Sequence, residues 1–160
     1  MPSGPWTAAT FLCRRRRNHA SDYINYKGWH SMILLALADH RYRFRFVNVG
    51  SLGRCHDAYV YQRSRLATAV EGPLFPFPLT PNLVKPFPHR GQLSEEQKTY
   101  NYHLSRSRRI VENAFGRMRA RFRFVLKRME CDIDNASLAI HACCVLNNVC
   151  EHFGDGVLPQ

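Results

Sequence analysis

Apolar and polar residues in the first third of the chain follow the spacing of β-strands. Residues 31–38 (SMILLALA) form an apolar run, which is typical of a central strand buried on both faces. After a short turn, residues 42–49 alternate between aromatic and charged side chains. A period of two predicts a half-exposed strand, so the two runs together predict a hairpin, which the glycine-containing residues 50–53 should end.

Further along, the spacing of apolar residues becomes helical. Asp57 is placed to cap a helix whose apolar positions are Val60, Leu66, Ala67 and Val70. Ser94 and Gln97 have the spacing of a capping box, which predicts that a long helix begins there. Its apolar stripe comprises Tyr100, Leu104, Val111, Phe115, Met118 and Phe122. Gly116 lies within that helix, where a glycine predicts a close packing contact.

A final helix is expected from Asn135 or Ser137 to Phe153, where Gly154 should end it. Its predicted buried stripe comprises Ala139, Ala142, Cys143, Leu146, Val149, Cys150 and Phe153. Residues 72–90 carry six of the nine prolines, so they are predicted to connect elements rather than to form a helix or a central strand. Residues 1–20 show no clear element.

The charge of the chain says more about its function than its overall composition does. The 160 residues suit one globular domain, but the net charge is +11. Residues 98–128 hold ten Lys and Arg side chains and one acid. Such a segment favours contact with a phosphate backbone, with a merely basic surface as the alternative. The predicted nucleic-acid-binding residues are Arg106, Arg108, Arg109, Arg117, Arg119, Arg121 and Arg123.

Several other classes of protein are excluded or left as alternatives. No apolar stretch is long enough for a transmembrane helix, and the N-terminal pattern is wrong for a signal peptide. We therefore expect the six cysteines to be the thiols of an intracellular protein. The cluster of His141, Cys143, Cys144, Cys150 and His152 fits no zinc-finger spacing, so buried thiols are favoured over a zinc site. Arg14–Arg17 could be a nuclear-import signal or a solvated tail.

Glu112 is the acid within the basic segment. Helical spacing favours an ion pair with Arg108 over a metal-binding carboxylate. A series of short motifs in a fixed order changes that balance, because the chain resembles the Harbinger-type transposases of the DDE superfamily and the nucleases derived from them. The motifs are Asn25–Ser31, Ala38-Asp39, Gly50-Ser51, His56-Asp57, Phe77–Pro81, Asn101-Tyr102, Leu104–Arg108, Val111–Arg117 and Ala142–Asn148.

The resemblance implies an α/β fold of the RNase H-like kind, in which three carboxylates hold two divalent metal ions for hydrolysis of a DNA phosphodiester. It makes Glu112 the third carboxylate and the catalytic candidate, with Mg²⁺ or Mn²⁺ as the implied cofactor. The first two are not found, since no acid precedes Asp22 and none lies in residues 72–76. The fold is therefore expected to be incomplete, without the first catalytic strand and without the strand before Phe77-Pro78-Leu79.

Asp39 and Asp57 remain as candidate metal ligands, although the favoured interpretations are that Asp39 is a turn residue and that Asp57 caps a helix. The expected organisation is a basic, poorly ordered N-terminal segment (1–20), a partial nuclease-like domain (21–153) with a Pro-rich connector at about 72–90, and a tail (154–160). We expect a catalytically impaired nuclease that keeps nucleic-acid binding; a working nuclease, a partner-binding protein and a non-functional fragment stay open. DNA is the implied partner, and a separate DNA-binding protein is a second implied partner. The implied compartment is the nucleus, with the cytoplasm as a further possibility.

Overall fold

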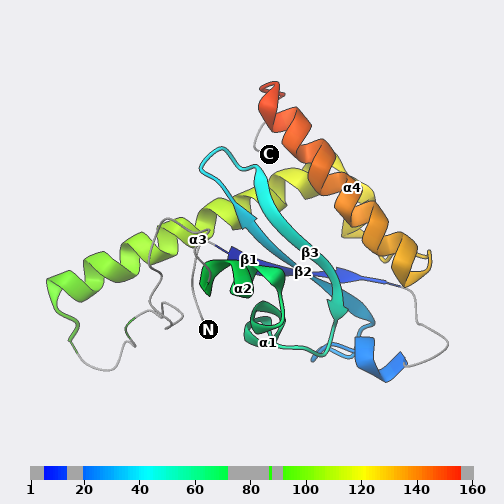
Figure 1. The fold of residues 1–160 in the computed structure, drawn as a ribbon, viewed down its shortest axis with the longest axis horizontal. Helices are drawn as coiled ribbons and strands as arrows, with labels where there is room; N and C mark the ends of the chain where they lie inside the picture. The colour runs from blue at the N-terminus through cyan, green and yellow to red at the C-terminus, as the bar shows by residue number, and fades with distance from the viewer. Residues whose placement is uncertain (1–5, 14–19, 72–86, 88–91, 156–160) are drawn as a thin grey trace.

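The structure is a computed structural model that describes residues 6–13, 20–71, 87 and 92–155. Within these residues, three strands are followed by four α-helices, which confirms the α/β class. The strands are β1 (Trp6–Leu12), β2 (Ser31–Ala38) and β3 (Phe44–Leu52), and the helices are α1 (Asp57–Gln62), α2 (Arg65–Glu71), α3 (Glu95–Arg121) and α4 (Ile133–His152) (Figure 1). Short 3-10 helices, η1 (Ala20–Tyr23) and η2 (Arg123–Leu126), precede β2 and follow α3.

Three of the sequence-based expectations fall on residues outside those that the structure describes. These are the role of Arg14–Arg17, the course of the Pro-rich segment apart from Phe87, and the strand expected to be missing before Phe77. Phe87 itself lies against α3, where its backbone N–H donates to the side-chain oxygen of Asn101 at 2.8 Å and its ring packs on Tyr100.

The sheet is antiparallel in the order β1-β2-β3, so the predicted hairpin and the central position of residues 31–38 are confirmed. The hairpin does not end at the glycines, however, because β3 continues to Leu52. Ile33 pairs with Ser51 and Leu34 pairs with Val49, so Gly50 is the extra residue of a bulge. Its φ of +99° is the reason a glycine suits this position.

β1 was not expected, since residues 1–20 showed no clear element. Trp6–Leu12 nevertheless pairs with β2 along its whole length. Its core-facing residues are Ala9 and Phe11, followed by the buried Cys13 just after the strand, and small alanines give a weak apolar signal. The hydrogen bonds that make this segment a strand come from β2, which lies about twenty-five residues later in the chain. A strand therefore does precede Asn25–Ser31, so the absence expected there is not confirmed, and this strand carries no acid.

Local signals located the start of α3 but not that of α1. Ser94 Oγ accepts from the Gln97 N–H at 3.2 Å, and Gln97 Oε1 accepts from the Ser94 N–H at 3.1 Å, so the capping box is confirmed. The capping role expected of Asp57 is wrong, because His56 is the N-cap and makes no side-chain capping bond. The helix expected from Asp57 onward is two helices, interrupted where Ser64 Oγ accepts from the Ala67 N–H at 3.3 Å.

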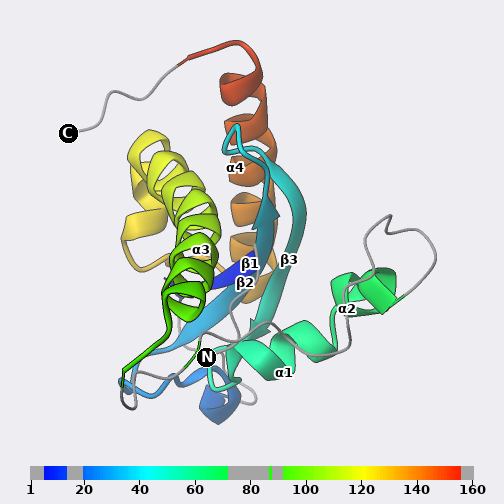
Figure 2. The ribbon, with the colours of Figure 1, turned by 90° about the vertical axis from the view of Figure 1, so that its left-hand side faces the viewer.

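The two faces of the sheet are covered by different helices, with α3 and α4 on one face and α1 and α2 on the other (Figure 2). Met32, Leu34 and Ala36 of β2 join the larger core under α3 and α4. Ile33 and Leu35 point to the opposite face, where they meet α1 and α2. The expected burial of β2 on both faces is therefore confirmed.

The buried face of α4 differs from the predicted stripe. The buried residues are Ile133, Ala136, Ile140, Cys143, Cys144 and Asn147, whereas Leu146, Val149 and Phe153 are exposed. Two asparagines fix the helix in this orientation. Asn148 Oδ1 accepts from the Phe44 N–H at 2.7 Å, and its Nδ2 donates to the Phe44 carbonyl at 2.8 Å. Asn147 Oδ1 accepts from Arg121 at 2.6 Å, so polar contacts outweigh the apolar pattern.

The packing contact expected at Gly116 is also wrong, because no described atom lies within 4 Å of a Cβ built there. The close approach occurs instead at Gly53, where a Cβ would overlap the carbonyl oxygen and the Oγ of Ser31. None of the helices in the described part of the chain is long and apolar enough to cross a membrane.

Candidate functional site

A pocket of about 570 Å³ lies between β1, the loop that leads into β2, and α3. Its volume is in the range of small-molecule sites, about 300–1,000 Å³. Strand β1 contributes Ala8, Ala9, Thr10 and Leu12 to its lining. The residues that line the pocket are Ala8, Ala9, Thr10, Leu12, Asn25, Tyr26, Lys27, Trp29, Arg108, Glu112, Phe115 and Arg119.

Glu112 lies on the α3 wall of this pocket and is the one acid among its lining residues. Its Oε1 accepts a hydrogen bond from Arg108 Nε at 2.8 Å, one helical turn away. Both side chains are partly exposed, 47% for Glu112 and 40% for Arg108. The ion pair expected from helical spacing is therefore present, and it lies within the pocket.

Asp39 does not approach this pocket. It lies in the turn between β2 and β3, where its carboxylate pairs with Arg43 at 3.0 Å and accepts the backbone N–H groups of Arg41 and Arg43. Burial tends to raise the pKa of Asp39, but the hydrogen bonds from Arg43 and Arg41 outweigh it and lower that pKa. The interpretation of Asp39 as a turn residue accounts for every one of these contacts.

Asp57 is the first residue of α1 and does not line the pocket. Burial raises the pKa of its carboxyl, and the positive charge of Arg108 partly offsets that effect. Arg108 is thus the basic residue between two acids, since it pairs with Glu112 and also acts on Asp57 over a longer distance.

The residues present do not fit the pair of divalent ions that the resemblance implies. A hard cation such as Mg²⁺ or Mn²⁺ needs several oxygen ligands, and the pocket offers one carboxylate that already has an arginine partner. Among the described residues, no three His, Cys, Asp or Glu side chains lie close enough together to hold a metal. At the C-terminal end, Cys143 and Cys144 are buried in the core, as the interpretation of these residues as buried thiols expected.

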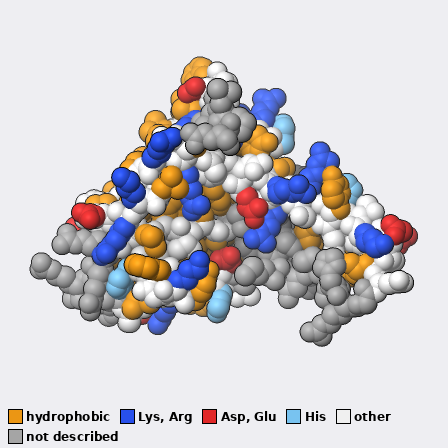
Figure 3. Space-filling view, turned by 180° about the vertical axis from the view of Figure 1, so that it is seen from behind, with side chains coloured by type: hydrophobic (Ala, Val, Ile, Leu, Met, Phe, Trp, Pro, Cys, Tyr) orange, Lys and Arg blue, Asp and Glu red, His pale blue; other side chains and the backbone are white. Residues whose placement is uncertain are grey.

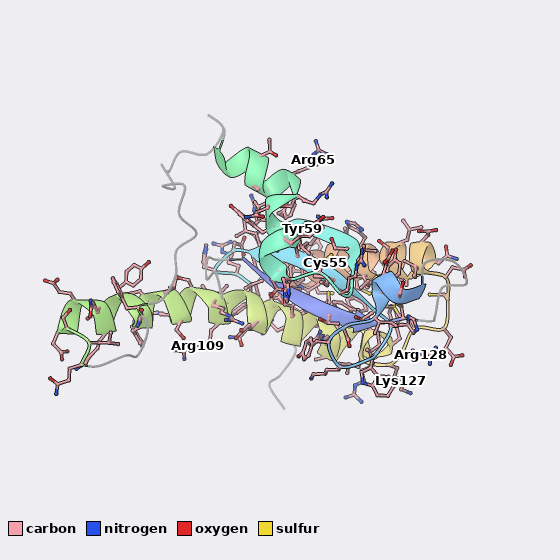
Figure 4. The ribbon with its side chains drawn as sticks, turned by 90° about the horizontal axis from the view of Figure 1, so that it is seen from below. Cys55, Tyr59, Arg65, Arg109, Lys127 and Arg128 are labelled. Carbon is pink, nitrogen blue, oxygen red and sulfur yellow. The ribbon has the colours of Figure 1, made fainter. Side chains whose placement is uncertain are left out.

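The seven arginines predicted to bind nucleic acid occupy three different environments. Arg106 and Arg109 are exposed on α3, and Arg123 is exposed on η2. Arg108 and Arg119 line the pocket. Figure 4 shows Arg109 on the side of α3 away from α1 and α2, with Lys127 and Arg128 farther along on that side. Viewed from the α3 side, the surface carries many Lys and Arg side chains and few acids (Figure 3).

Arg117 and Arg121 are in a third environment, because they are bound by Glu151 of α4. Glu151 Oε1 accepts from Arg117 Nε at 2.7 Å and from Arg121 at 2.5 Å. The side chains of Arg121 and Glu151 are only 8% and 7% exposed. Burial tends to raise the pKa of Glu151, but the hydrogen bonds from Arg117 and Arg121 outweigh it and lower that pKa. These two arginines therefore join α3 to α4.

Arg119 has no carboxylate partner among the residues that the structure describes. Its guanidinium lies 5.0 Å from the centre of the Phe11 ring and donates to the carbonyl of Thr10 at 3.3 Å. Arg119 is partly buried, and this burial lowers the pKa of its guanidinium below its ordinary value. A partly buried cation without an acid is unusual and marks a place where an anion would be stabilised.

The opposite rim of the pocket was missed by the sequence analysis, which used Asn25–Ser31 only for its resemblance. Asn25 shapes this loop, since its Oδ1 accepts the N–H groups of Lys27 and Trp29 at 2.9 and 3.1 Å. Tyr26 and Trp29 are 91% and 59% exposed. Two exposed aromatic side chains flanking Lys27, together with a turn at Gly28, were the signal available in the sequence.

A helix-flanked sheet with a basic, arginine-lined pocket defines an α/β domain suited to a phosphate-bearing partner. The chain belongs to the DDE superfamily of endonucleases: the family model described as DDE superfamily endonuclease matches residues 9–148. That range begins within β1 and ends within α4, so it includes β2, β3, most of β1 and Glu112. No curated protein and no solved structure matches the chain. The family implies a nuclease or transposase-like activity on DNA.

Proposed function

We propose that this chain is a catalytically impaired DDE-family nuclease domain that binds DNA through α3. The observation that carries the proposal is the composition of the pocket beside Glu112. Its β1 wall consists of Ala8, Ala9, Thr10 and Leu12, and the one carboxylate among its described lining residues is paired with Arg108. Two-metal hydrolysis of a phosphodiester requires ligands on both sides of the reacting phosphate, and this pocket does not supply them.

In this proposal, β1 corresponds to the first strand of an RNase H-like fold of the Harbinger kind. The strand lies where the sequence resemblance requires it, ahead of Asn25–Ser31, and is hydrogen-bonded to β2. Glu112 lies across the pocket from it on α3, which is the relation expected of a first and a third carboxylate. An alanine or a threonine in place of the first acid leaves Glu112 without a partner for a shared cation.

DNA binding would use the exposed arginines of α3 and of the segment that follows it. A helix of 27 residues is about 40 Å long, which is enough to follow several phosphates of a duplex. The residues available for this contact are Arg106, Arg109, Arg123, Lys127 and Arg128. Arg117 and Arg121 are left out of the proposed interface because Glu151 holds them. A DNA partner makes the nucleus the proposed compartment.

The proposal predicts that the chain does not cleave labelled duplex DNA in Mg²⁺ or Mn²⁺, either as the native sequence or as Glu112→Ala. It also predicts duplex binding that weakens with salt. Replacing Arg106 and Arg109 together by glutamine should lower the slope of log K against log salt by about 2, since each phosphate contact contributes about 0.9. Fluorescence anisotropy at several salt concentrations measures this change.

The matched control replaces Arg41 and Arg45 by glutamine, because both are exposed on the β2–β3 hairpin and the change in net charge is the same. A cooperative thermal transition shows that each variant is folded. Cleavage by the native chain that Glu112→Ala abolishes would overturn the proposed impairment. Equal loss of binding in the two double variants would show that α3 is not the interface.

A second candidate, a non-catalytic partner-binding protein, is favoured by the outer surface of α4. Five large apolar side chains there are each 46% or more exposed: Leu138, Val145, Leu146, Val149 and Phe153. Contiguous exposed apolar side chains of this kind are typical of a protein-binding surface. A folded chain that binds no DNA even at low salt would make this the better account.

A further inference from the structure

The charge of the pocket beside Glu112 is opposite to that of a metal site. Among the described residues, three cations line it, Lys27, Arg108 and Arg119, against the single carboxylate of Glu112. Of these cations only Arg108 has an acid partner in the described structure, and Arg119 is held in place by the Phe11 ring and the Thr10 carbonyl. A pocket with an excess of positive charge repels Mg²⁺ and attracts an anion.

The rim opposite α3 adds a second requirement on the ligand. Trp29 lines the pocket and is more than half exposed, and Tyr26 beside it is almost fully exposed. The loop that carries them is preorganised, because Asn25 accepts two backbone N–H groups through its Oδ1 and donates to Ser31 Oγ at 3.1 Å. A rigid aromatic ring beside unpaired cations is the arrangement that binds a base and its phosphate together.

We propose that this pocket binds single-stranded nucleic acid without a metal ion, with a base stacked on Trp29 and a phosphate held by Arg108 and Arg119. The inference rests on the proposed function and deepens it, because it names the ligand of the pocket. A single strand is preferred because the faces of its bases are open to stacking, whereas those of a duplex are covered by neighbouring base pairs. The pocket volume of about 570 Å³ leaves room for one nucleotide.

In this pocket the Glu112 carboxylate should weaken ligand binding, whereas in a metal site it would strengthen binding that depends on the metal. Its carboxylate occupies Arg108 Nε and repels the phosphate of the ligand. Removing its charge should therefore strengthen binding. If the pocket held Mg²⁺, the same change would remove a metal ligand and weaken any binding that depends on the metal.

The experiment is fluorescence anisotropy with a short labelled oligodeoxythymidylate, first in EDTA and then with added Mg²⁺. We expect binding in EDTA that Mg²⁺ does not strengthen. Trp29→Ala should weaken it about tenfold, the effect of losing one stacked base, and Trp29→Phe should recover most of the affinity. Arg119→Ala should lower the salt slope by about 0.7, the value for one phosphate contact of a single strand. Glu112→Gln should bind more tightly than the native chain.

Each variant has a control that makes the same chemical change outside the pocket. Glu96→Gln removes one acid from the first turn of α3, Phe153→Ala removes an exposed ring at the C-cap of α4, and Arg65→Ala removes an exposed cation from α2. Trp29 and Glu112 are exposed, so these variants should remain folded, and thermal melting checks this.

Three results would overturn the inference. The first is single-strand binding that requires Mg²⁺ and weakens in Glu112→Gln. The second is that the affinities of the variants differ from those of their controls by less than twofold. The third is that the chain binds duplex DNA but not the single strand. In the last case the proposed function of α3 stands and only the ligand of the pocket is wrong. Failure to bind either form of DNA at low salt would overturn both proposals.

Discussion

At the scale of single residues, the two glycines Gly53 and Gly116 show how little a residue type says without its surroundings. Gly116 lies in a helix with open space around its Cα, whereas Gly53 lies directly against Ser31. The sequence analysis expected the close contact at Gly116, and it used Gly53 only as part of the end of the hairpin. The neighbours of Gly53 are Ser31 of β2 and Tyr23 of η1, more than twenty residues earlier in the chain, so no local pattern indicates them.

The difference between these glycines gives a prediction of opposite sign for one substitution. Gly53→Ala should lower the free energy of unfolding by about 2 kcal/mol, because the new methyl group meets backbone and must displace it. Gly116→Ala should raise it by about 0.5–1 kcal/mol, since alanine is the better helix former and its Cβ meets nothing. Urea denaturation measures both, and similar effects from the two changes would contradict the assignment of the close contact.

The arginines likewise show that residue type alone does not determine the role of a charged side chain. Arg109, Arg119 and Arg121 are alike in the sequence, yet one is exposed, one lies in the pocket without an acid, and one is held by Glu151. The sequence analysis predicted one role for all three. Because the partners come from β1 and α4, the roles are set by contacts that helical spacing alone does not show.

At the scale of elements, the joint between α3 and α4 is the clearest case of charge used inside the fold. Glu151 receives hydrogen bonds from Arg117 and Arg121, and the Arg117 guanidinium also lies 5.1 Å from the centre of the Tyr42 ring in the β2–β3 turn. Arg121 further donates to Asn147 and to the backbone carbonyl of Asp155. Two helices and a hairpin are therefore linked through one carboxylate.

Removing that carboxylate should have a large effect. Glu151→Gln should lower the free energy of unfolding by about 3 kcal/mol, because it leaves the largely buried charge of Arg121 without its partner. The control is Glu95→Gln, which breaks an exposed pair with Lys98 and should change stability by less than about 0.5 kcal/mol. Chemical denaturation compares them, and equal effects would mean that the α3–α4 joint contributes no more than a surface pair.

The elements also differ in how far their own sequence specifies them. The Ser94 capping box and the run at residues 31–38 act through neighbours in sequence, and both were predicted with the correct position. The face of α4 was not, because two asparagines and Glu151 bind distant partners and turn the helix away from its most apolar stripe. An amphipathic pattern indicates a helix, but polar contacts can decide which side is buried.

At the scale of the whole molecule, acid stability should follow from two carboxyls whose pKa values are lowered. Hydrogen bonds from arginine outweigh burial at both Glu151 and Asp39, so their charged forms are favoured in the folded state. Their contribution is present above the unfolded pKa values, about 4, and is lost as the pH falls through the lower folded values. Burial raises the pKa of Asp57, which acts in the opposite direction because its protonated form is favoured on folding.

We therefore predict that stability falls as the pH is lowered below about 4, and that Glu151→Gln falls less steeply than the native chain. The measurement is the urea midpoint from neutral pH down to about pH 3 for both proteins. Parallel curves would show that Glu151 does not carry this dependence. A steeper fall in the variant would contradict the sign of the shift in the pKa of Glu151.

The sequence by itself determined the family, the hairpin at β2 and β3, the residue at which α3 begins and the basic character of residues 98–128. Each of these features depends either on residues that are close together in the chain or, as with charge, on a total over many residues. The tertiary structure alone decided that residues 6–12 form β1, that Glu151 holds Arg117 and Arg121, and that Trp29 and Arg119 line the same pocket. The physical reason is that a strand edge, a buried ion pair and a pocket each need partners from distant segments. Only packing brings those segments together.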